Sequence, residues 1–193
     1  INVVQMFNGD TFSTFSTAQA ALEYLDAAQE AGIMGFIPLY NGGNPAAHDS
    51  NIERTIRVLN DERVINHPAL FGFGICDEPY LRKAKQADLE NSYRLIRQYD
   101  TKHPIMMVVA FAGSYAKGSN LVDVLEIDPY GTAESGRACV DTQNACAASD
   151  YKKPVYTLLG TYRYDSGRIP SKEEVRNNNW QALIGGAGAI GYY

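Results

Sequence analysis

The stretch Asn66-His-Pro-Ala-Leu-Phe-Gly-Phe-Gly-Ile-Cys-Asp-Glu-Pro-Tyr80 is the most informative part of the chain. It is a glycine-rich apolar run that ends in two carboxylates and a proline. Side chains of a strand alternate between two faces, so Gly72, Gly74, Cys76 and Glu78 share one face. Small side chains are tolerated in the crowded interior of a barrel, while bulky ones belong against the outer helices. We therefore expect Glu78 to point into a barrel mouth at the carboxyl end of this strand.

Similar apolar runs recur along the chain and alternate with segments of helical period, a pattern typical of βα units around a parallel sheet. The expected strands span residues 2–6, 34–40, 70–76, 105–111, 122–128, 155–161 and 189–193. The first expected helix is capped by Ser16 or Thr17 and closed by Gly32, and its periodic residues are Ala21, Leu22, Leu25, Ala28 and Gln29. Further helices are expected over about 52–59, 88–99 and 171–184. Ser171 and Glu174 form a capping box, and we expect 131–150 to be a loop with a short helix.

This pattern fits either an open doubly wound sheet or a (β/α)8 barrel. The chain contains no GxGxxG turn after its first strand and no GxxxxGK[ST] loop, so the nucleotide-binding alternatives lose their main support. With 193 residues, 45% hydrophobic and 20% charged, we expect one domain over residues 1–193. The formal charge of -5 attracts no phosphate backbone, and no apolar run approaches the length of a bilayer span, so we expect neither a nucleic-acid nor a membrane partner.

The three cysteines are Cys76, Cys139 and Cys146, and they form no CxxC motif. We expect no metal site and no cofactor. Cys139 and Cys146 could bridge if they flank a turn, which would suit an oxidising compartment and an extracellular or cell-surface location; the alternative is two inert thiols. Cys76 lies in an apolar strand and is expected to be a buried free thiol.

A second predicted strand also ends in a carboxylate. In the stretch Val122-Asp-Val-Leu-Glu-Ile-Asp-Pro-Tyr-Gly131, Glu126 and Asp128 share one face, and Tyr130 follows. Two carboxylates on strand tips are what cleavage of a glycosidic bond requires, one to protonate the leaving oxygen and one to act as base or nucleophile. The competing interpretation is that Asp77 and Glu78 are only the N-terminal charges of a helix that has Pro79 in its first turn.

Several motifs, in order, resemble the clan of glycoside hydrolase (β/α)8 barrels in which a Glu ends strand four, in particular the members with Asp-Glu-Pro there. The matching segments are His67-Pro68, Phe71-Gly72-Phe73 and Asp77-Glu78-Pro79 for strand four, Tyr93 to Pro104 for the following helix and turn, Ile127-Asp128-Pro129-Tyr130 for strand six, and Arg168 to Arg176 with Gly185 to Tyr193 for the last helix and strand eight.

The resemblance implies an α/β fold, a (β/α)8 TIM barrel whose second strand is the opening Ile1-Asn-Val-Val4, so that the first βα unit is absent from this chain. The sequence departs from the better-known enzymes of the clan in two places. Residues 154–162 contain no carboxylate where those enzymes place a nucleophilic Glu on strand seven, and Asp77 stands where they carry an Asn.

The function implied is a carbohydrate-active glycoside hydrolase that acts on an oligo- or polysaccharide. Glu78 is the expected general acid/base, with a pKa raised inside the barrel mouth, and the more exposed Asp128 is its expected ionised partner. Asp77 and several aromatic side chains are the expected sugar-binding groups, because rings stack on sugar faces. The aromatic candidates are Tyr40, Tyr130, Tyr162 and Tyr192. The alternative is a catalytically inactive barrel that binds carbohydrate; the oligomeric state stays open.

Overall fold

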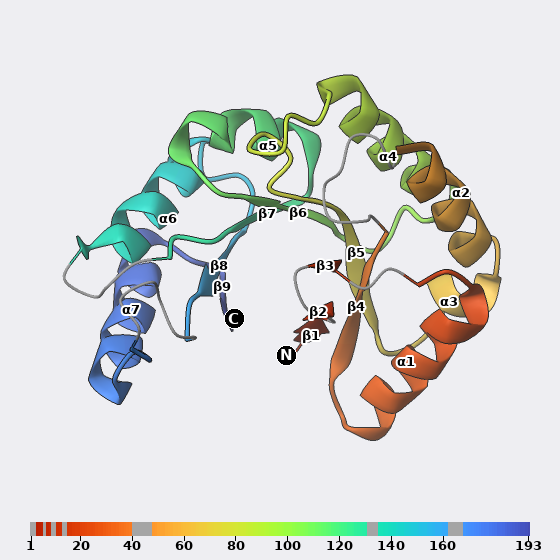
Figure 1. Cartoon of the computed structure of the whole chain (residues 1–193), viewed down its shortest axis with the longest axis horizontal. Coiled ribbons are helices and arrows are strands. Elements are labelled where there is room, and N and C mark those ends of the chain that lie inside the picture. The colour runs from red at the N-terminus through yellow and green to blue at the C-terminus, as the bar shows by residue number, and fades with distance from the viewer. Residues whose placement is uncertain are drawn as a thin grey trace. The chain divides into compact units, whose positions relative to one another are not determined.

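The computed structural model describes residues 3–5, 7–8, 11–12, 15–39, 48–130, 135–161 and 168–193. The chain divides into two compact units, residues 1–107 and residues 108–193. In each unit, strands of a parallel sheet alternate with helices along the sequence (Figure 1). The chain is therefore α/β, as the sequence predicts.

The first unit holds strands in the order β1-β4-β5-β6, with its helices on one side of them (Figure 1). The β1–β4 and β4–β5 pairs are parallel, and β2 and β3 form a separate antiparallel pair. The strands are β1 (Val3–Gln5), β2 (Phe7–Asn8), β3 (Thr11–Phe12), β4 (Met34–Pro38), β5 (Leu70–Asp77) and the start of β6 (Ile105–Val109). The helices are α1 (Ala18–Glu30), α2 (His48–Leu59), α3 (Glu62–Ile65) and α4 (Gln86–Tyr99).

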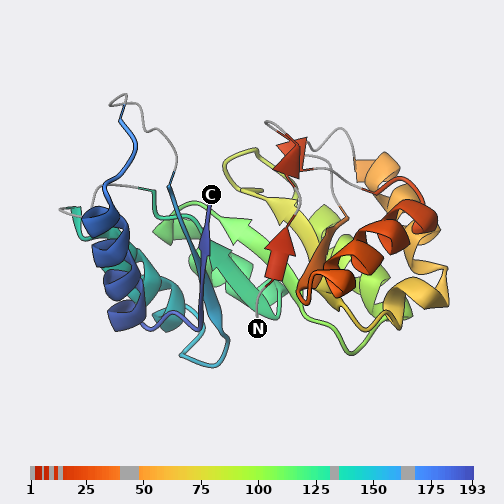
Figure 2. The same ribbon diagram turned by 90° about the horizontal axis from the view of Figure 1, so that it is seen from below.

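The second unit continues the order as β6-β7-β8-β9, and its β7–β8 and β8–β9 pairs are parallel. Helix α7 packs beside α6 (Figure 2). The strands after β6 are β7 (Val124–Ile127), β8 (Val155–Leu159) and β9 (Ala189–Tyr192). The helices are the 3-10 turn η2 (Ala112–Ser114), α5 (Tyr115–Leu121), α6 (Arg137–Ala147) and α7 (Lys172–Gly185).

All seven predicted strands are present in the sheet, each within a few residues of its expected ends. Sequential parallel strands joined through helices are the topology of part of a (β/α)8 barrel. The absence of a first βα unit and the single-domain organisation stay predictions. Among the described residues, no helix combines the length and the apolar character needed to span a membrane.

The predicted helix ends are confirmed in atomic detail. The Thr17 hydroxyl accepts a hydrogen bond from the backbone N–H of Ala20, which caps α1, and Gly32 follows the helix with a φ of 69°. At α7, Ser171 and Glu174 form the complete capping box. Because these polar contacts join residues close in the sequence, the sequence alone predicts where the two helices begin.

Strands β5 and β6 meet at a position where only glycine fits. The backbone N–H of Phe73 donates to the carbonyl oxygen of Pro104 over 3.0 Å. A Cβ placed on Gly72 would collide with that same carbonyl oxygen, so a larger residue would force the backbones apart. This contact fixes the start of β6 against β5.

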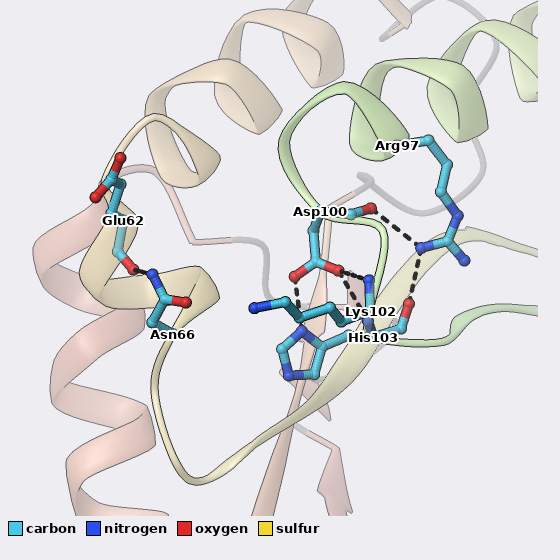
Figure 3. A network of polar contacts seen from close by, with 6 residues as sticks. All are labelled: Glu62, Asn66, Arg97, Asp100, Lys102 and His103. Carbon is cyan, nitrogen blue, oxygen red and sulfur yellow. Dashed lines mark hydrogen bonds and ion pairs between the residues drawn. The ribbon is translucent and has the colours of Figure 1, made fainter.

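The turn that leads into β6 is held by the Asp100 carboxylate (Figure 3). It accepts hydrogen bonds from the backbone N–H groups of Lys102 and His103, both 2.8 Å, and from His103 Nδ1 at 2.6 Å. Arg97 donates to the carbonyl oxygens of Asp100 and His103. Burial disfavours the ionised form of Asp100, but the bonds from His103 and Lys102 outweigh it and lower the pKa of the carboxyl.

The structure corrects the interpretation of residues 131–150. Instead of a loop with a short helix, residues 137–147 form an 11-residue helix, α6, that packs on α7 and β8. Cys139 and Cys146 both lie on this helix, and a rise of 1.5 Å per residue separates their Cα atoms by about 10 Å, beyond the roughly 7 Å that a disulfide can span. Both are free thiols, as is the buried Cys76. The disulfide prediction was wrong, and an extracellular location stays an expectation without that support.

Asn in place of Asp100 should lower the free energy of unfolding by about 2 kcal/mol at neutral pH, because the charged acceptor of His103 is lost. Since the pKa of Asp100 is lower in the folded than in the unfolded chain, its contribution exists above the unfolded value of about 3.9 and disappears as the pH falls through the folded value. Urea unfolding of both proteins between pH 3 and 7 measures this. Asp150→Asn is the control, because the Asp150 side chain is 82% exposed and should matter by less than about 0.5 kcal/mol. Equal losses in the two variants would contradict the assignment.

All three cysteines should react with an alkylating reagent when the chain is denatured without reductant. The helical separation of Cys139 and Cys146 is the reason, and peptide mass mapping is the measurement. A linked peptide containing both residues would show that α6 does not persist as described.

Candidate active site

The candidate acidic residues lie where β5 ends. Strand β5 stops at Asp77, and Glu78 has a φ of 44°, in the left-handed region that residues with a side chain rarely adopt. The alternation of side chains along the strand therefore does not extend to Glu78, and the direction predicted for its side chain from that alternation does not hold. The backbone turns here: the N–H groups of Leu81 and Arg82 both donate to the carbonyl oxygen of Glu78.

This turn brings Arg82, which the sequence analysis did not single out, back to both carboxylates. Its Nη2 atom lies 2.9 Å from Asp77 Oδ2 and 3.5 Å from Glu78 Oε2. Its Nε atom also donates to the backbone carbonyl of Asp77 over 3.2 Å. The side chains of Asp77 and Glu78 are 15% and 21% exposed, so the ion pairs are partly shielded from water.

The pKa of Asp77 is raised. Burial and the neighbouring Glu78 charge raise the pKa of Asp77 to about 6, against the opposing effect of Arg82. Burial, with the Asp77 charge, also raises the pKa of the Cys76 thiol to about 12. Cys76 therefore carries no thiolate near neutral pH and is unsuited to act as a nucleophile.

The Tyr80 hydroxyl links the turn after β5 to the first residue of α4. It donates to Gln86 Oε1 over 3.1 Å, and burial raises its pKa to about 12. Asp77, with a pKa of about 6, thus has a perturbed pKa of the kind found where side chains transfer protons.

The second unit places Glu126 and Tyr156 on the face of its sheet opposite the helices. Thr157 bonds to Thr142 of α6, so Thr157 faces the helices and Tyr156, one residue earlier, faces away. Glu126 is paired with Tyr156 in register and is 1% exposed. Burial and the Glu126 charge raise the pKa of Tyr156 to about 12.

Asp128 follows β7 directly and is 8% exposed, which reverses our expectation that it would be more exposed than Glu78. It lies near the buried Tyr115 of α5, whose pKa is raised by burial and by the charges of Asp141 and Asp128. Its environment is therefore that of a buried carboxylate beside a tyrosine.

The tyrosines predicted to bind sugar lie in different surroundings. The ring of Tyr130 lies 6.2 Å, centroid to centroid, from Tyr193, which is 42% exposed. The Tyr192 hydroxyl instead accepts a hydrogen bond from Asn179 of α7 over 3.0 Å, so Tyr192 faces the helix. Tyr40 and Tyr162 lie outside the described residues. Tyr193 is not among the residues predicted from the sequence, although the alternation of side chains along β9, continued by one residue, places it on the face opposite Tyr192.

In the part of the chain that the structure describes, no group of three or more His, Cys, Asp or Glu side chains is arranged to hold a metal ion. The residues described above offer the chemistry of carboxylates, an arginine and tyrosines.

Comparisons of the sequence with protein-family models and with curated proteins found no match. Solved structures do match. A beta-glucuronidase from an uncultured Clostridium species is 17% identical with a TM-score of 0.61, over 89% of this chain and 35% of its own. A glycoside hydrolase family 17 beta-1,3-glucanosyltransferase from Rhizomucor miehei is 15% identical with a TM-score of 0.66, over 91% of this chain and 70% of its own.

The PgaB (BpsB) glycoside hydrolase domain from Bordetella bronchiseptica is more distant, 11% identical with a TM-score of 0.54 over 86% of this chain. At these identities the likeness concerns the fold, and the chain spans about a third of the glucuronidase. The chain thus has an α/β fold that is consistent with part of the TIM-barrel-like fold of these glycoside hydrolases, the fold that the sequence motifs predict.

Proposed function

We propose that the chain carries the acid/base site of a glycoside hydrolase at the carboxyl end of β5. The observation that carries this proposal is the Asp77–Glu78 pair, partly buried and bound to one Arg82 nitrogen, in a fold that glycoside hydrolases share. In such barrels the catalytic groups lie at the carboxyl ends of the strands. Glycosidic cleavage needs a carboxylic acid that protonates the leaving oxygen, and this pair supplies carboxyls of that kind.

In this proposal Glu78 is the general acid/base and Asp77 contacts the sugar. Asp128, which follows β7 in the second unit, is retained as a proposed catalytic carboxylate on the sequence resemblance alone. Its position after a strand and its burial beside Tyr115 are compatible with a group kept away from bulk water. The proposal assigns no metal and no cofactor to the reaction.

The proposed substrate is an oligo- or polysaccharide. One solved structure similar to this chain is an active-site mutant of the Rhizomucor miehei beta-1,3-glucanosyltransferase in complex with laminaritriose. Tyr130 and the exposed Tyr193 offer neighbouring rings in the second unit, and such rings stack on sugar faces. Beta-1,3-glucan oligosaccharides and glucuronides are therefore the first substrates to test.

A second candidate function is carbohydrate binding without catalysis. Strand β8, Val155–Leu159, contains no Asp or Glu, although the enzymes that the sequence resembles place a nucleophilic Glu on strand seven. A barrel that keeps a sugar-binding mouth and lacks this group would bind glycans without hydrolysing them.

Replacing Glu78 by Gln should lower kcat by about 10²- to 10⁴-fold with little effect on glycan binding, because the shape is kept and the transferable proton is lost. Release of reducing ends from a panel of glycans measures turnover, and calorimetry measures binding. Glu23→Gln is the matched control: Glu23 is exposed on α1, where it bonds to Gln19, and its variant should keep full activity.

The outcomes separate the two candidates. Hydrolysis that Glu78→Gln leaves unchanged rejects this acid/base site. Glycan binding by the unaltered chain without any hydrolysis selects the inactive, carbohydrate-binding barrel.

A further inference from the structure

One guanidinium nitrogen contacts both carboxylates of the candidate site. Asp77 Oδ2 and Glu78 Oε2 both lie within 3.5 Å of Arg82 Nη2. The two acids follow one another in sequence, yet consecutive residues of a regular strand would point to opposite faces. The left-handed backbone at Glu78 removes that separation, and Arg82 binds the two side chains together.

The arginine is itself fixed by the backbone of the same turn. Its N–H bonds to the carbonyl oxygen of Glu78, and its Nε bonds to the carbonyl oxygen of Asp77. The guanidinium therefore has a defined direction even though its side chain is 38% exposed. A planar group with several donors suits this task better than the single point charge of a lysine.

We propose that Arg82 is a positioning residue that holds the side chains of Asp77 and Glu78 together as one acid pair. The inference deepens the proposed function, and its catalytic meaning rests on that function. The coupling of the two carboxyls is a property of the chain itself and can be tested without a substrate.

The charges around Asp77 support this assignment. Burial and then the Glu78 charge raise the pKa of Asp77, and Arg82 opposes them, so that this pKa is about 6. Cys76 and Tyr80, the other titratable groups of this segment, stay neutral because their pKa values lie near 12, and Glu90 of α4 acts on Tyr80. Asp77 therefore takes up its proton as the pH falls through about 6, and protonated Asp77 gains an O–H donor that the ionised form lacks.

The test is a carbon-13 NMR titration of the Asp77 carboxyl in the full chain. In Arg82→Gln the midpoint should move upward by about one pH unit or more, because the stabilising cation is lost. In Glu78→Gln it should move downward, because the repelling charge is lost. Arg82→Lys keeps the charge without the planar fork and should give a smaller upward move than Arg82→Gln.

Arg94→Gln is the matched control, since Arg94 is exposed on α4 and bonds to Asn91 and the Glu90 carbonyl rather than to either acid. It should leave the Asp77 midpoint unchanged. An Asp77 midpoint that is the same in the parent chain, Arg82→Gln and Glu78→Gln overturns the inference. Near-UV circular dichroism checks each fold, and if Arg82→Gln does not fold, the Asp77 midpoint in Arg82→Lys decides: an upward move supports the inference, and an unchanged midpoint overturns it.

Failure of this inference differs from failure of the proposed function. Coupled titration in a chain that hydrolyses no glycan keeps the acid pair and rejects the hydrolase. Hydrolysis with uncoupled titration rejects the pair alone. If both hold, activity should fall as the pH rises through the Asp77 midpoint, and this alkaline limb should move to higher pH in Arg82→Gln.

Discussion

The close approach of β5 and β6 is the constraint on which the first unit depends. Gly72 leaves room for the Pro104 carbonyl, Phe73 donates to it, and the Asp100 carboxylate holds the turn that delivers Pro104 to this place. The apolar core closes around the same strand, because Phe73 is fully buried and its ring meets His103 edge-on. Backbone contacts thus fix the start of strand β5. Because the strand is rigid, they also define where Asp77 and Glu78 lie at its other end.

The sequence predicts most of the fold because the relevant signals are local. Apolar runs mark the strands, and the caps at Thr17 and Ser171 are side chains that bond to backbone three residues away. Helix α6 was underestimated because its buried face is built from small and weakly apolar residues rather than a leucine stripe. Those residues are Ala138, Thr142, Ala145 and Cys146. The helix is stabilised by packing on α7 and β8, and a pattern of neighbouring residues in the sequence does not reveal such long-range contacts.

The candidate site was predictable in its location but not in its chemistry. The end of β5 follows from the apolar run, but the left-handed backbone at Glu78 does not, and that one torsion invalidates the alternation used to aim the side chain. Arg82 has no distinguishing pattern in the sequence; only the turn brings it to Asp77. The same difficulty applies to β9, where a displacement of one residue separates Tyr193, beside Tyr130, from Tyr192, beside Asn179.

The backbone of Glu78 also creates a conflict between heat resistance and chemistry. A left-handed conformation costs a residue with a side chain about 1–2 kcal/mol, a cost that glycine does not incur. Laboratory evolution for thermal stability alone would therefore favour glycine at this position, and it would remove a carboxylate while improving the fold. A more heat-resistant variant of this chain would therefore need stabilising substitutions at other positions, with Glu78 left unchanged.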